Sequence, residues 1–330
     1  MNERVQFNEN DYAPERSIAK SKPVKYYPCS MSIKPIISLQ KLTKSYGKSR
    51  GIENISFDVM PGEVFGFLGP NGAGKTTAIR TLVGLIHATS GSAQILGHDA
   101  LASSVELRKK IGYLPGVLSI YKGYTAWQYL QFIAKMRGRN CDLKIIEYAK
   151  RLNLDLHKHI SELSKGNRQK VGVIQAFMHQ PEVLFLDEPT SGLDPIVQRE
   201  FESILDEAKL RGAAVMLSSH VLSEVEHLAD RVAIINEGKL IVVEKISVLK
   251  ERAPRTIDLY FNAAIEPSVF DQVQGIKDLQ VKGTKASCTI IGSESQLLTI
   301  ALRNGLETVR THEPTLDEIF LSLVTAGKPQ

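Results

Sequence analysis

The first residues that could do chemistry form a glycine-rich run at residues 69–76, Gly-Pro-Asn-Gly-Ala-Gly-Lys-Thr. The run fits GxxxxGK[ST], in which glycines let consecutive backbone N–H groups wrap a phosphate chain that a Cβ would push away. Lys75 would then neutralise β- and γ-phosphate oxygens, and Thr76 would bind Mg²⁺. The bland alternative is a structural glycine-rich turn. The candidate nucleotide-binding residues here are Gly69, Pro70, Asn71, Gly72, Ala73, Gly74, Lys75, Thr76 and Thr77.

The second candidate is a pair of carboxylates, Asp187 and Glu188, directly after the apolar run 183–186. A strand that ends in two acids is the arrangement of a Walker B segment. Asp187 would complete a Mg²⁺ shell with Thr76, and Glu188 could accept a proton from an attacking water. The alternative is a strand end with solvated acids. The chain has no NKxD segment, which disfavours a GTPase.

These residues need a scaffold, and four apolar runs provide it, at 64–68, 183–186, 213–217 and 232–235. Each is short, continuous and β-rich, as is typical of parallel strands buried on both faces. A helical pattern at 79–86 follows the glycine run, so bound phosphates would lie at a helix N-terminus, where the dipole favours anions. The sequence therefore predicts an α/β core.

Three further regions flank or interrupt this core. Residues 36–59 alternate apolar and polar residues with turn residues Gly47, Gly51 and Asn54 between them, which predicts antiparallel strands. Residues 125–163 carry two helical patterns and no strand signal, and so read as a helical insertion. The patterns in 256–310 follow the order β-α-β-β-α-β, the split βαβ arrangement of a small α+β domain. A closing helix is expected over 315–323.

Composition limits the class of protein. The chain has 330 residues, 43% of them hydrophobic and 23% charged, which fits a soluble globular protein and excludes collagen or wholesale disorder. The longest stretch without charged residues, 81–98, contains glycines and polar residues, whereas a membrane span needs ~20 mostly apolar ones. Three distant cysteines favour a reducing cytoplasm. A net charge of +5 without a basic block predicts no nucleic-acid partner.

Four further motifs resemble those of ABC ATPases. Leu-Ser-Lys-Gly-Asn at 163–167 looks like a variant of the LSGGQ signature and precedes an expected helix, and 189–194 resembles the D-loop. His220 resembles the switch histidine, and Tyr46 lies where the family carries an aromatic that stacks on adenine. A lone histidine or tyrosine is usually a packing residue. Together with the glycine run, these motifs follow the family's order over about residues 36–245.

The resemblance implies a P-loop NTPase (ABC ATPase) core that uses ATP and Mg²⁺. It assigns catalytic roles to Glu188, His220 and Lys75, metal ligation to Thr76 and Asp187, and nucleotide contacts to Tyr46, Ser164 and Gly166 as well as the glycine run. It further implies a homodimer paired head to tail, in which Ser164 and Gly166 of one copy face the ATP of the other and Asp194 connects the two sites. ATP would close this dimer and hydrolysis would release it.

Three segments resemble the bacterial and archaeal export branch whose ATPase and permease are separate chains. They are 112–115, 163–170 and the closing His-Glu-Pro-Thr-Leu-Asp-Glu-Ile-Phe of 312–320. The implied partner is a distinct membrane permease, which would hold this cytoplasmic chain peripherally at the inner face of the cell membrane. One departure is Gly116, which stands where most members have the Gln of the Q-loop.

We expect three parts in the chain. They are a flexible N-terminal extension over 1–34, an ABC ATP-binding domain over 35–248 with a helical subdomain at about 117–165, and an accessory domain over 249–330. The start site could also lie downstream of residue 1, at the second Met. The accessory domain could bind an effector, although packing or dimer support is favoured.

The segment 121–129 is unusually aromatic, with Tyr121, Tyr124, Trp127 and Tyr129. In ABC ATPases this region contacts the cytoplasmic helix of the permease, and the resemblance therefore favours a docking role for the segment. Ordinary packing in the helical core is the alternative. 

Two other functions compete with the transporter subunit. A soluble ABC ATPase acting on ribosomes or nucleic acid usually has paired ATPase domains or long coiled-coil insertions, and neither is found. A P-loop kinase would leave residues 164–167 and His220 without a task. The sequence names no transported substrate.

Overall fold

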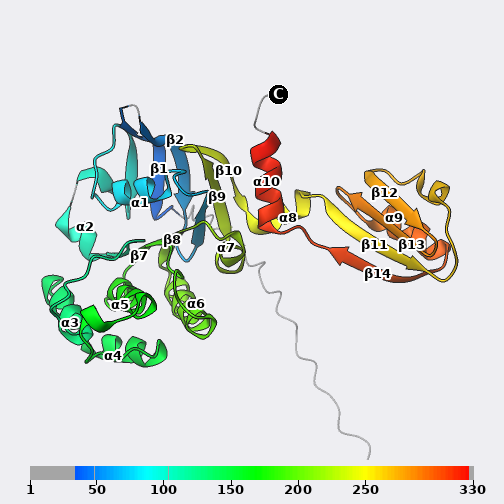
Figure 1. Cartoon of the computed structure of the whole chain (residues 1–330). Coiled ribbons are helices and arrows are strands. Elements are labelled where there is room, and N and C mark those ends of the chain that lie inside the picture. Colours follow the sequence, from blue (N-terminus) through cyan, green and yellow to red (C-terminus); the bar gives the residue numbers. More distant parts are fainter. Residues whose placement is uncertain (1–33, 48, 103, 327–330) are drawn as a thin grey trace, which may run out of the picture. The chain divides into compact units, whose positions relative to one another are not determined.

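The computed structural model describes residues 34–47, 49–102 and 104–326 (Figure 1). The N-terminal extension expected over 1–34 lies outside the described residues except for Lys34.

A six-stranded sheet forms the centre of the α/β core, in the order β10-β9-β3-β8-β7-β6. The strands are β3 (Val64–Leu68), β6 (Ile111–Leu114), β7 (Val183–Asp187), β8 (Ala214–Ser219), β9 (Arg231–Asn236) and β10 (Lys239–Lys245). All neighbours are parallel except the edge strand β10, which pairs antiparallel with β9. The four predicted parallel strands, now β3, β7, β8 and β9, are therefore confirmed.

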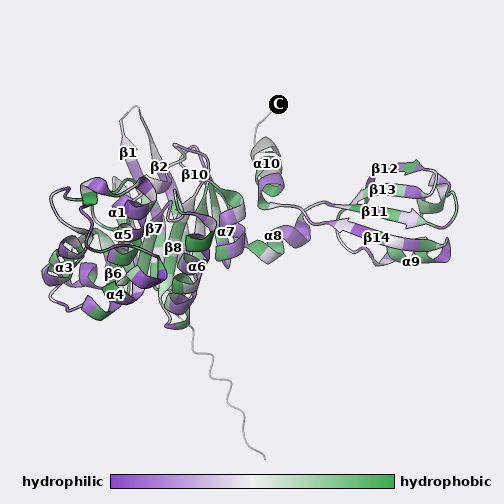
Figure 2. Ribbon diagram, turned by 60° about the horizontal axis from the view of Figure 1, so that its bottom comes forward, coloured by the Kyte–Doolittle hydropathy of each residue, from purple (hydrophilic) through white to green (hydrophobic). Residues whose placement is uncertain are grey.

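The side chains of these strands alternate between two hydrophobic clusters, one on each face of the sheet. In β7, Leu184 and Leu186 join one cluster, while Val183 and Phe185 join the other. Every residue of β3, β7 and β8 is buried, and the apolar colour runs along β7 and β8 in Figure 2. Continuous apolar runs are what such two-sided burial requires.

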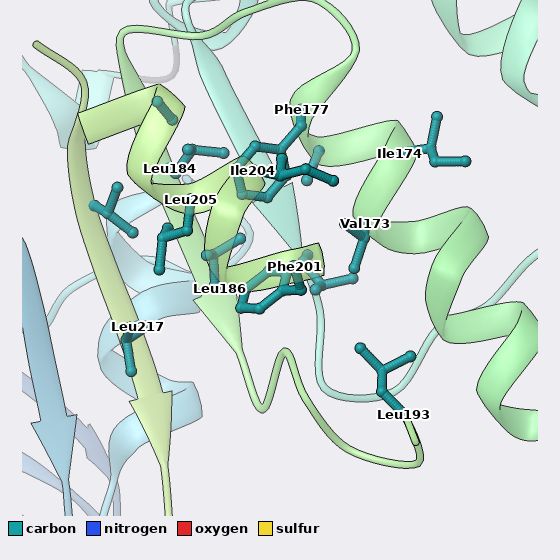
Figure 3. Packing of buried hydrophobic residues seen from close by; sticks show 14 of the residues in the cluster. Val173, Ile174, Phe177, Leu184, Leu186, Leu193, Phe201, Ile204, Leu205 and Leu217 are labelled. Atoms are coloured by element: carbon teal, nitrogen blue, oxygen red, sulfur yellow. The ribbon is translucent and has the colours of Figure 1, made fainter. Parts of the chain in front are cut away.

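Helices cover both faces of the sheet. They are α1 (Lys75–Leu82), α2 (Val105–Lys109), α5 (Lys165–Phe177), α6 (Pro195–Leu210), α7 (Leu222–Leu228) and α8 (Ile246–Arg252). Phe177 of α5 and Phe201 of α6 meet edge to face, with ring centroids 6.1 Å apart, over Leu184 and Leu186 of β7 (Figure 3). This packing holds α5 against the strand that ends at Asp187.

A second, antiparallel sheet has the order β2-β1-β4-β5. Its strands are β1 (Ile37–Tyr46), β2 (Ser49–Val59), β4 (Ser90–Ile95) and β5 (His98–Asp99), followed by the 3-10 turn η1 (Ala100–Ala102). The antiparallel prediction for 36–59 is confirmed. Gly51 and Asn54, however, lie inside β2 rather than in turns, and the β1–β2 register shifts along this stretch. Bulges use the same residue types as turns.

The helical insertion contains α3 (Ala126–Met136), α4 (Asp142–Arg151) and the 3-10 turn η2 (Ile160–Glu162). Thr125 and Gln128 cap α3 reciprocally, side chain to backbone, at 3.2 and 3.0 Å, as in a capping box. Residues 125–163 form no strand, in agreement with the prediction, apart from a single bridge between Thr125 and His159.

The C-terminal part forms a third sheet in the order β12-β13-β11-β14, with every neighbour antiparallel. Its elements are β11 (Arg255–Phe261), η3 (Pro267–Phe270), β12 (Ile276–Lys282), β13 (Lys285–Ile290), α9 (Ser295–Arg303) and β14 (Leu306–His312). This is the predicted split βαβ order, with the first helix reduced to the 3-10 turn η3. The closing helix is α10 (Leu316–Ala326), which contacts α7 and α8. The domain boundaries remain predictions.

Other differences from the predictions are local. The helix predicted across 79–86 ends at Leu82, because Gly84 adopts a φ of 72°. Strands β4, β5, β6 and β10 were not predicted. None of the helices in the described part of the chain has the length and apolar content needed to cross a bilayer.

Candidate ATP site

The glycine-rich run connects β3 to α1, as predicted. Gly69 follows the last residue of β3, and α1 begins at Lys75. Gly74 precedes the helix with a φ of 110°, a conformation that side chains with a Cβ rarely adopt. The first N–H groups of α1 have no intrahelical partners, so this end of the helix favours a phosphate.

One pocket unites this loop with the two predicted acids. The pocket has a volume of about 450 Å³. It is lined by residues 71–77 of the loop together with Arg80, Gly116, Val117, Asp187 and Glu188. The strands explain the meeting, because β3 and β7 both border β8 and end at the same edge of the sheet. Arg80 and Val117 had not been singled out from the sequence.

Lys75 is a buried cation at the base of this pocket, with only 6% of its surface exposed. Its Nζ donates to Gly69 O at 2.6 Å and to Pro70 O at 3.2 Å. Burial lowers the pKa of Lys75, and the nearby carboxylates of Glu188 and Asp187 act in the opposite direction. A desolvated ammonium held by backbone carbonyls is poised to interact with an anion.

Thr76 and Asp187 place two oxygen ligands at one point of the pocket. Thr76 Oγ1 donates to Asp187 Oδ2 at 2.8 Å, and Ser218 Oγ of β8 donates to Asp187 Oδ1. A hydroxyl and a carboxylate are the hard oxygen donors that Mg²⁺ prefers, and it usually binds through few protein ligands plus phosphates. The two predicted metal ligands therefore fit this ion.

Glu188 follows β7 at the mouth of the pocket, and its side chain is 22% exposed. Its backbone N–H donates to Ser218 O at 3.0 Å. His220 Nδ1 lies 2.8 Å from Glu188 Oε2. The structure thus brings together two of the three predicted catalytic side chains, Glu188 and His220.

The signature residues Ser164 and Gly166 lie elsewhere, since neither is among the described residues that line the pocket. Ser164 is exposed and caps α5, its Oγ accepting from Asn167 N at 3.2 Å. A Cβ on Gly166 would lie 2.4 Å from Gly192 O, so only glycine fits there. The helix begins three residues earlier than predicted, which makes Ser164 its N-cap.

Tyr46 and Asp194 also lie away from the described pocket lining, which does not include Gly69, Pro70 or His220 either. Tyr46, at the end of β1, is 46% exposed, and Lys44 Nζ lies 5.1 Å from the centre of its ring. Asp194 caps α6, with its Oδ1 accepting from Ile196 N and Val197 N at 3.1 and 3.0 Å. Their predicted contacts with ATP and between sites remain predictions.

Gly116 is an exposed residue that lines the pocket together with Asp187. A Cβ there would lie 3.2 Å from Asp187 Oδ2 and 3.3 Å from Asp187 Cγ. That distance is tighter than ordinary contact, so a larger residue would press on the candidate metal ligand.

The aromatic segment divides into a packed half and an exposed half. Tyr129 is buried and donates to Gln175 Oε1 at 2.6 Å, and Trp127 packs against the core. Tyr121, Tyr124 and Phe132 form an exposed aromatic cluster, in which the rings of Tyr124 and Phe132 stack with centroids 6.2 Å apart. Phe132 lies two turns into α3, beyond the aromatic segment predicted from the sequence.

Gln169 is a further residue that sequence analysis missed. It lies on α5, is 7% exposed, and contacts the backbone that follows β7. A glutamine at this spacing carries no signal of its own, because the contact depends on how α5 packs on the sheet.

Comparison with known proteins agrees with this geometry. The family described as "ABC transporter" matches residues 52–191. The chain is 34% identical over 301 residues to the bacitracin transport ATP-binding protein BcrA of Bacillus licheniformis, covering 88% of this chain and 98% of that one. It is 32% identical to the BcrA of Enterococcus faecalis, covering 90% and 99%.

A solved ATP-binding subunit of an ABC transporter superposes with a TM-score of 0.62 at 28% identity, covering 65% of this chain and 92% of that chain. The match with the two BcrA proteins extends over nearly their whole length, at identities above 30%. The chain belongs to the ATP-binding proteins of ABC transporters.

Proposed function

We propose that two copies of this chain hydrolyse ATP at composite sites and thereby drive export through a separately encoded membrane permease. The observation that carries the proposal is the pocket in which the phosphate-binding loop, Asp187 and Glu188 meet, with His220 next to the Glu188 carboxylate.

The geometry supports hydrolysis by in-line attack of water on the γ-phosphorus. The loop N–H groups and the start of α1 would hold the phosphates, with Lys75 countering their charge. Thr76 and Asp187 would hold Mg²⁺, which supplies positive charge at the phosphate oxygens. Glu188 would orient the attacking water and accept its proton while the bond to the β-phosphate oxygen breaks, releasing ADP and phosphate. His220 would hold Glu188 in place.

The second copy enters through the signature. Ser164 is exposed at the start of α5, outside its own pocket. In a head-to-tail pair this helix end would face the γ-phosphate of the other copy. A composite site of this kind explains why a chain would expose a capped helix N-terminus, and it ties hydrolysis to dimer opening.

The permease would dock on the exposed aromatic cluster of Tyr121, Tyr124 and Phe132. Contiguous exposed aromatic side chains are typical of interaction sites. Such docking would hold the chain at the inner face of the membrane. The bacitracin-transport relatives favour a cargo of the drug or antibiotic class. No nucleic acid is expected as a partner. We also infer that residues 35–248 form the ATPase domain and 249–330 an accessory domain that supports it.

The assignment of the base is tested with Glu188→Gln, which removes the proton acceptor and leaves Lys75 and the loop unchanged. We expect ATP to bind with unchanged affinity, phosphate release to fall by at least ~100-fold, and ATP-bound dimers to accumulate in size-exclusion chromatography. Lys75→Ala should instead weaken ATP binding. Turnover at the wild-type rate by Glu188→Gln would exclude Glu188 as the base.

A further inference from the structure

The backbone of Glu188 has an unusual conformation. Its φ is 53°, in the left-handed region that residues with a Cβ rarely enter. Such a conformation persists only where neighbouring contacts enforce it. The Glu188 N–H is held by Ser218 O at 3.0 Å, which leaves the carbonyl as the other backbone group to be fixed.

Gln169 supplies the side-chain restraint on that carbonyl, which also accepts from Ser191 N at 3.3 Å. Its Nε2 donates to Glu188 O at 3.2 Å and to Pro189 O at 2.9 Å, so one amide group binds two consecutive carbonyls. The side chain is buried, with 7% of the residue exposed. The restraint itself rests on a rigid base, because α5 packs on β7 through the cluster around Phe177 (Figure 3).

We propose that Gln169 is a positioning residue for ATP hydrolysis, because it fixes the turn at 188–189 so that the Glu188 carboxylate meets His220 at the pocket. The inference rests on the proposed function, in which Glu188 is the base. Gln169 is not among the described residues that line the pocket, so it acts through Glu188 and not on the nucleotide.

A purely structural role predicts a different result. A glutamine that only satisfies buried carbonyls would lower thermal stability when replaced, and the folded fraction would still turn over ATP normally. A positioning residue lowers kcat in fully folded protein and leaves ATP affinity unchanged, because Lys75 and the loop do not depend on it. The split between kcat and ATP affinity therefore separates the two roles.

The test is Gln169→Met in the full chain, which keeps side-chain length and removes both donated hydrogen bonds. The matched control is Gln175→Met on the same helix, which removes the bond from Tyr129 OH and touches no part of the ATP site. We expect kcat of Gln169→Met to fall roughly 10- to 100-fold with the ATP Kd within about twofold of wild type. The control should lose melting temperature and keep its kcat.

Two further variants keep the inference falsifiable. Gln169→Asn retains the amide but withdraws it by one methylene, and it replaces the methionine variant in the test if that variant fails to fold. It should also lower kcat with the fold intact. Adding Gln169→Met to Glu188→Gln should lower the residual rate no further, since no base is left to position. If either Gln169 variant has the same kcat as the control, the inference about Gln169 is overturned and the proposed role of Glu188 is not affected. Wild-type turnover by Glu188→Gln overturns the proposed base and this inference together.

Discussion

His220 Nδ1 lies 2.8 Å from Glu188 Oε2, and each residue directly follows one of two neighbouring parallel strands. Asp187 of β7 is in register with Ser218 of β8, so the residues that follow these strands emerge side by side at the carboxyl edge of the sheet. Polar groups gather there because each buried strand ends where solvent begins. The Glu188–His220 contact is thus a consequence of strand register.

His220→Ala should lower kcat by at least ~10-fold and leave ATP affinity intact, because the Glu188 carboxylate loses the neighbour that orients it. Steady-state ATPase rates and ATP titrations measure the two quantities. His227→Ala, an exposed histidine on α7, is the control. Equal kcat values for the two variants would show that His220 has no role in hydrolysis.

The head-to-tail dimer predicts complementation between two inactive variants. Ser164→Arg should block the signature side of a site, and Lys75→Ala its nucleotide side, so a heterodimer of the two retains one intact composite site. We expect the mixture to recover ATPase activity that neither variant has alone.

Ser164→Arg also removes the N-cap of α5, which should lower stability by about 1 kcal/mol. Ser104→Arg removes the N-cap of α2 in the same way and serves as the control for this loss of stability. A verified heterodimer without any activity would contradict independent composite sites.

The exposed aromatic cluster predicts a defect that appears only with the permease. Phe132 is 39% exposed and stacks on Tyr124 outside the ATP pocket. Phe132→Ala should keep basal ATPase activity and reduce permease-stimulated activity about tenfold, as expected for an interface anchor worth ~1.4 kcal/mol. Leu143→Ala, an 85% exposed apolar residue of α4, is the control. An equal loss in both activities would show that Phe132 serves packing.

The sequence predicted the scaffold of the site well where burial alone determines structure. Strands β3, β7, β8 and β9 are continuous apolar runs, because both of their faces are covered. The loop at 69–76 was predictable for a different reason, since its glycines are required by backbone geometry. Strand β6 was missed because it has four residues and includes Gly112, where a Cβ would lie 2.3 Å from Ala176 O.

Contacts between distant segments were the part that sequence patterns could not provide. Gln169 reaches Glu188 only because α5 packs beside the end of β7. For the aromatic segment the sequence favours docking, with core packing as the alternative, whereas in the structure Trp127 and Tyr129 pack toward the core and Phe132 joins the exposed side. Such pairings depend on tertiary packing, which no local pattern records.

His179 predicts a pH dependence of stability. It is 3% exposed, its Nε2 lies 3.2 Å from Ile111 O and 3.1 Å from Arg137 Nη1, and burial together with the charges of Arg137 and Arg139 lowers its pKa to about 4. The unfolded chain protonates this group near pH 6.5. Between these values the unfolded state binds the extra proton, so stability falls as pH falls through the window, by about 3 kcal/mol.

The measurement is the free energy of unfolding by urea from pH 7 to pH 4. His179→Gln keeps a polar side chain but cannot titrate, so the difference between the two curves isolates His179 from the carboxylates that also titrate. The free energy of unfolding of the wild type minus that of His179→Gln should fall as pH falls, because only the wild type has the titrating histidine. A constant difference across the window would mean that His179 titrates normally in the folded protein.

The close approach of Gly116 to Asp187 predicts that a side chain at position 116 would weaken the proposed Mg²⁺ site. A Cβ there would lie 3.2 Å from Asp187 Oδ2, and Asp187 cannot easily move because Thr76 and Ser218 hold both of its oxygens. Gly116→Ala should therefore displace a proposed Mg²⁺ ligand, raise the Mg²⁺ concentration for half-maximal ATPase activity, and lower kcat by less than about tenfold, or ~1.4 kcal/mol of barrier.

Gly123→Ala is the matched control, since a Cβ at Gly123 meets nothing within 4 Å. The readout is ATPase rate against Mg²⁺ concentration at saturating ATP. If both variants keep the wild-type Mg²⁺ dependence, the loop at Gly116 yields to the added carbon, and the close approach to Asp187 has no part in how the site holds its metal.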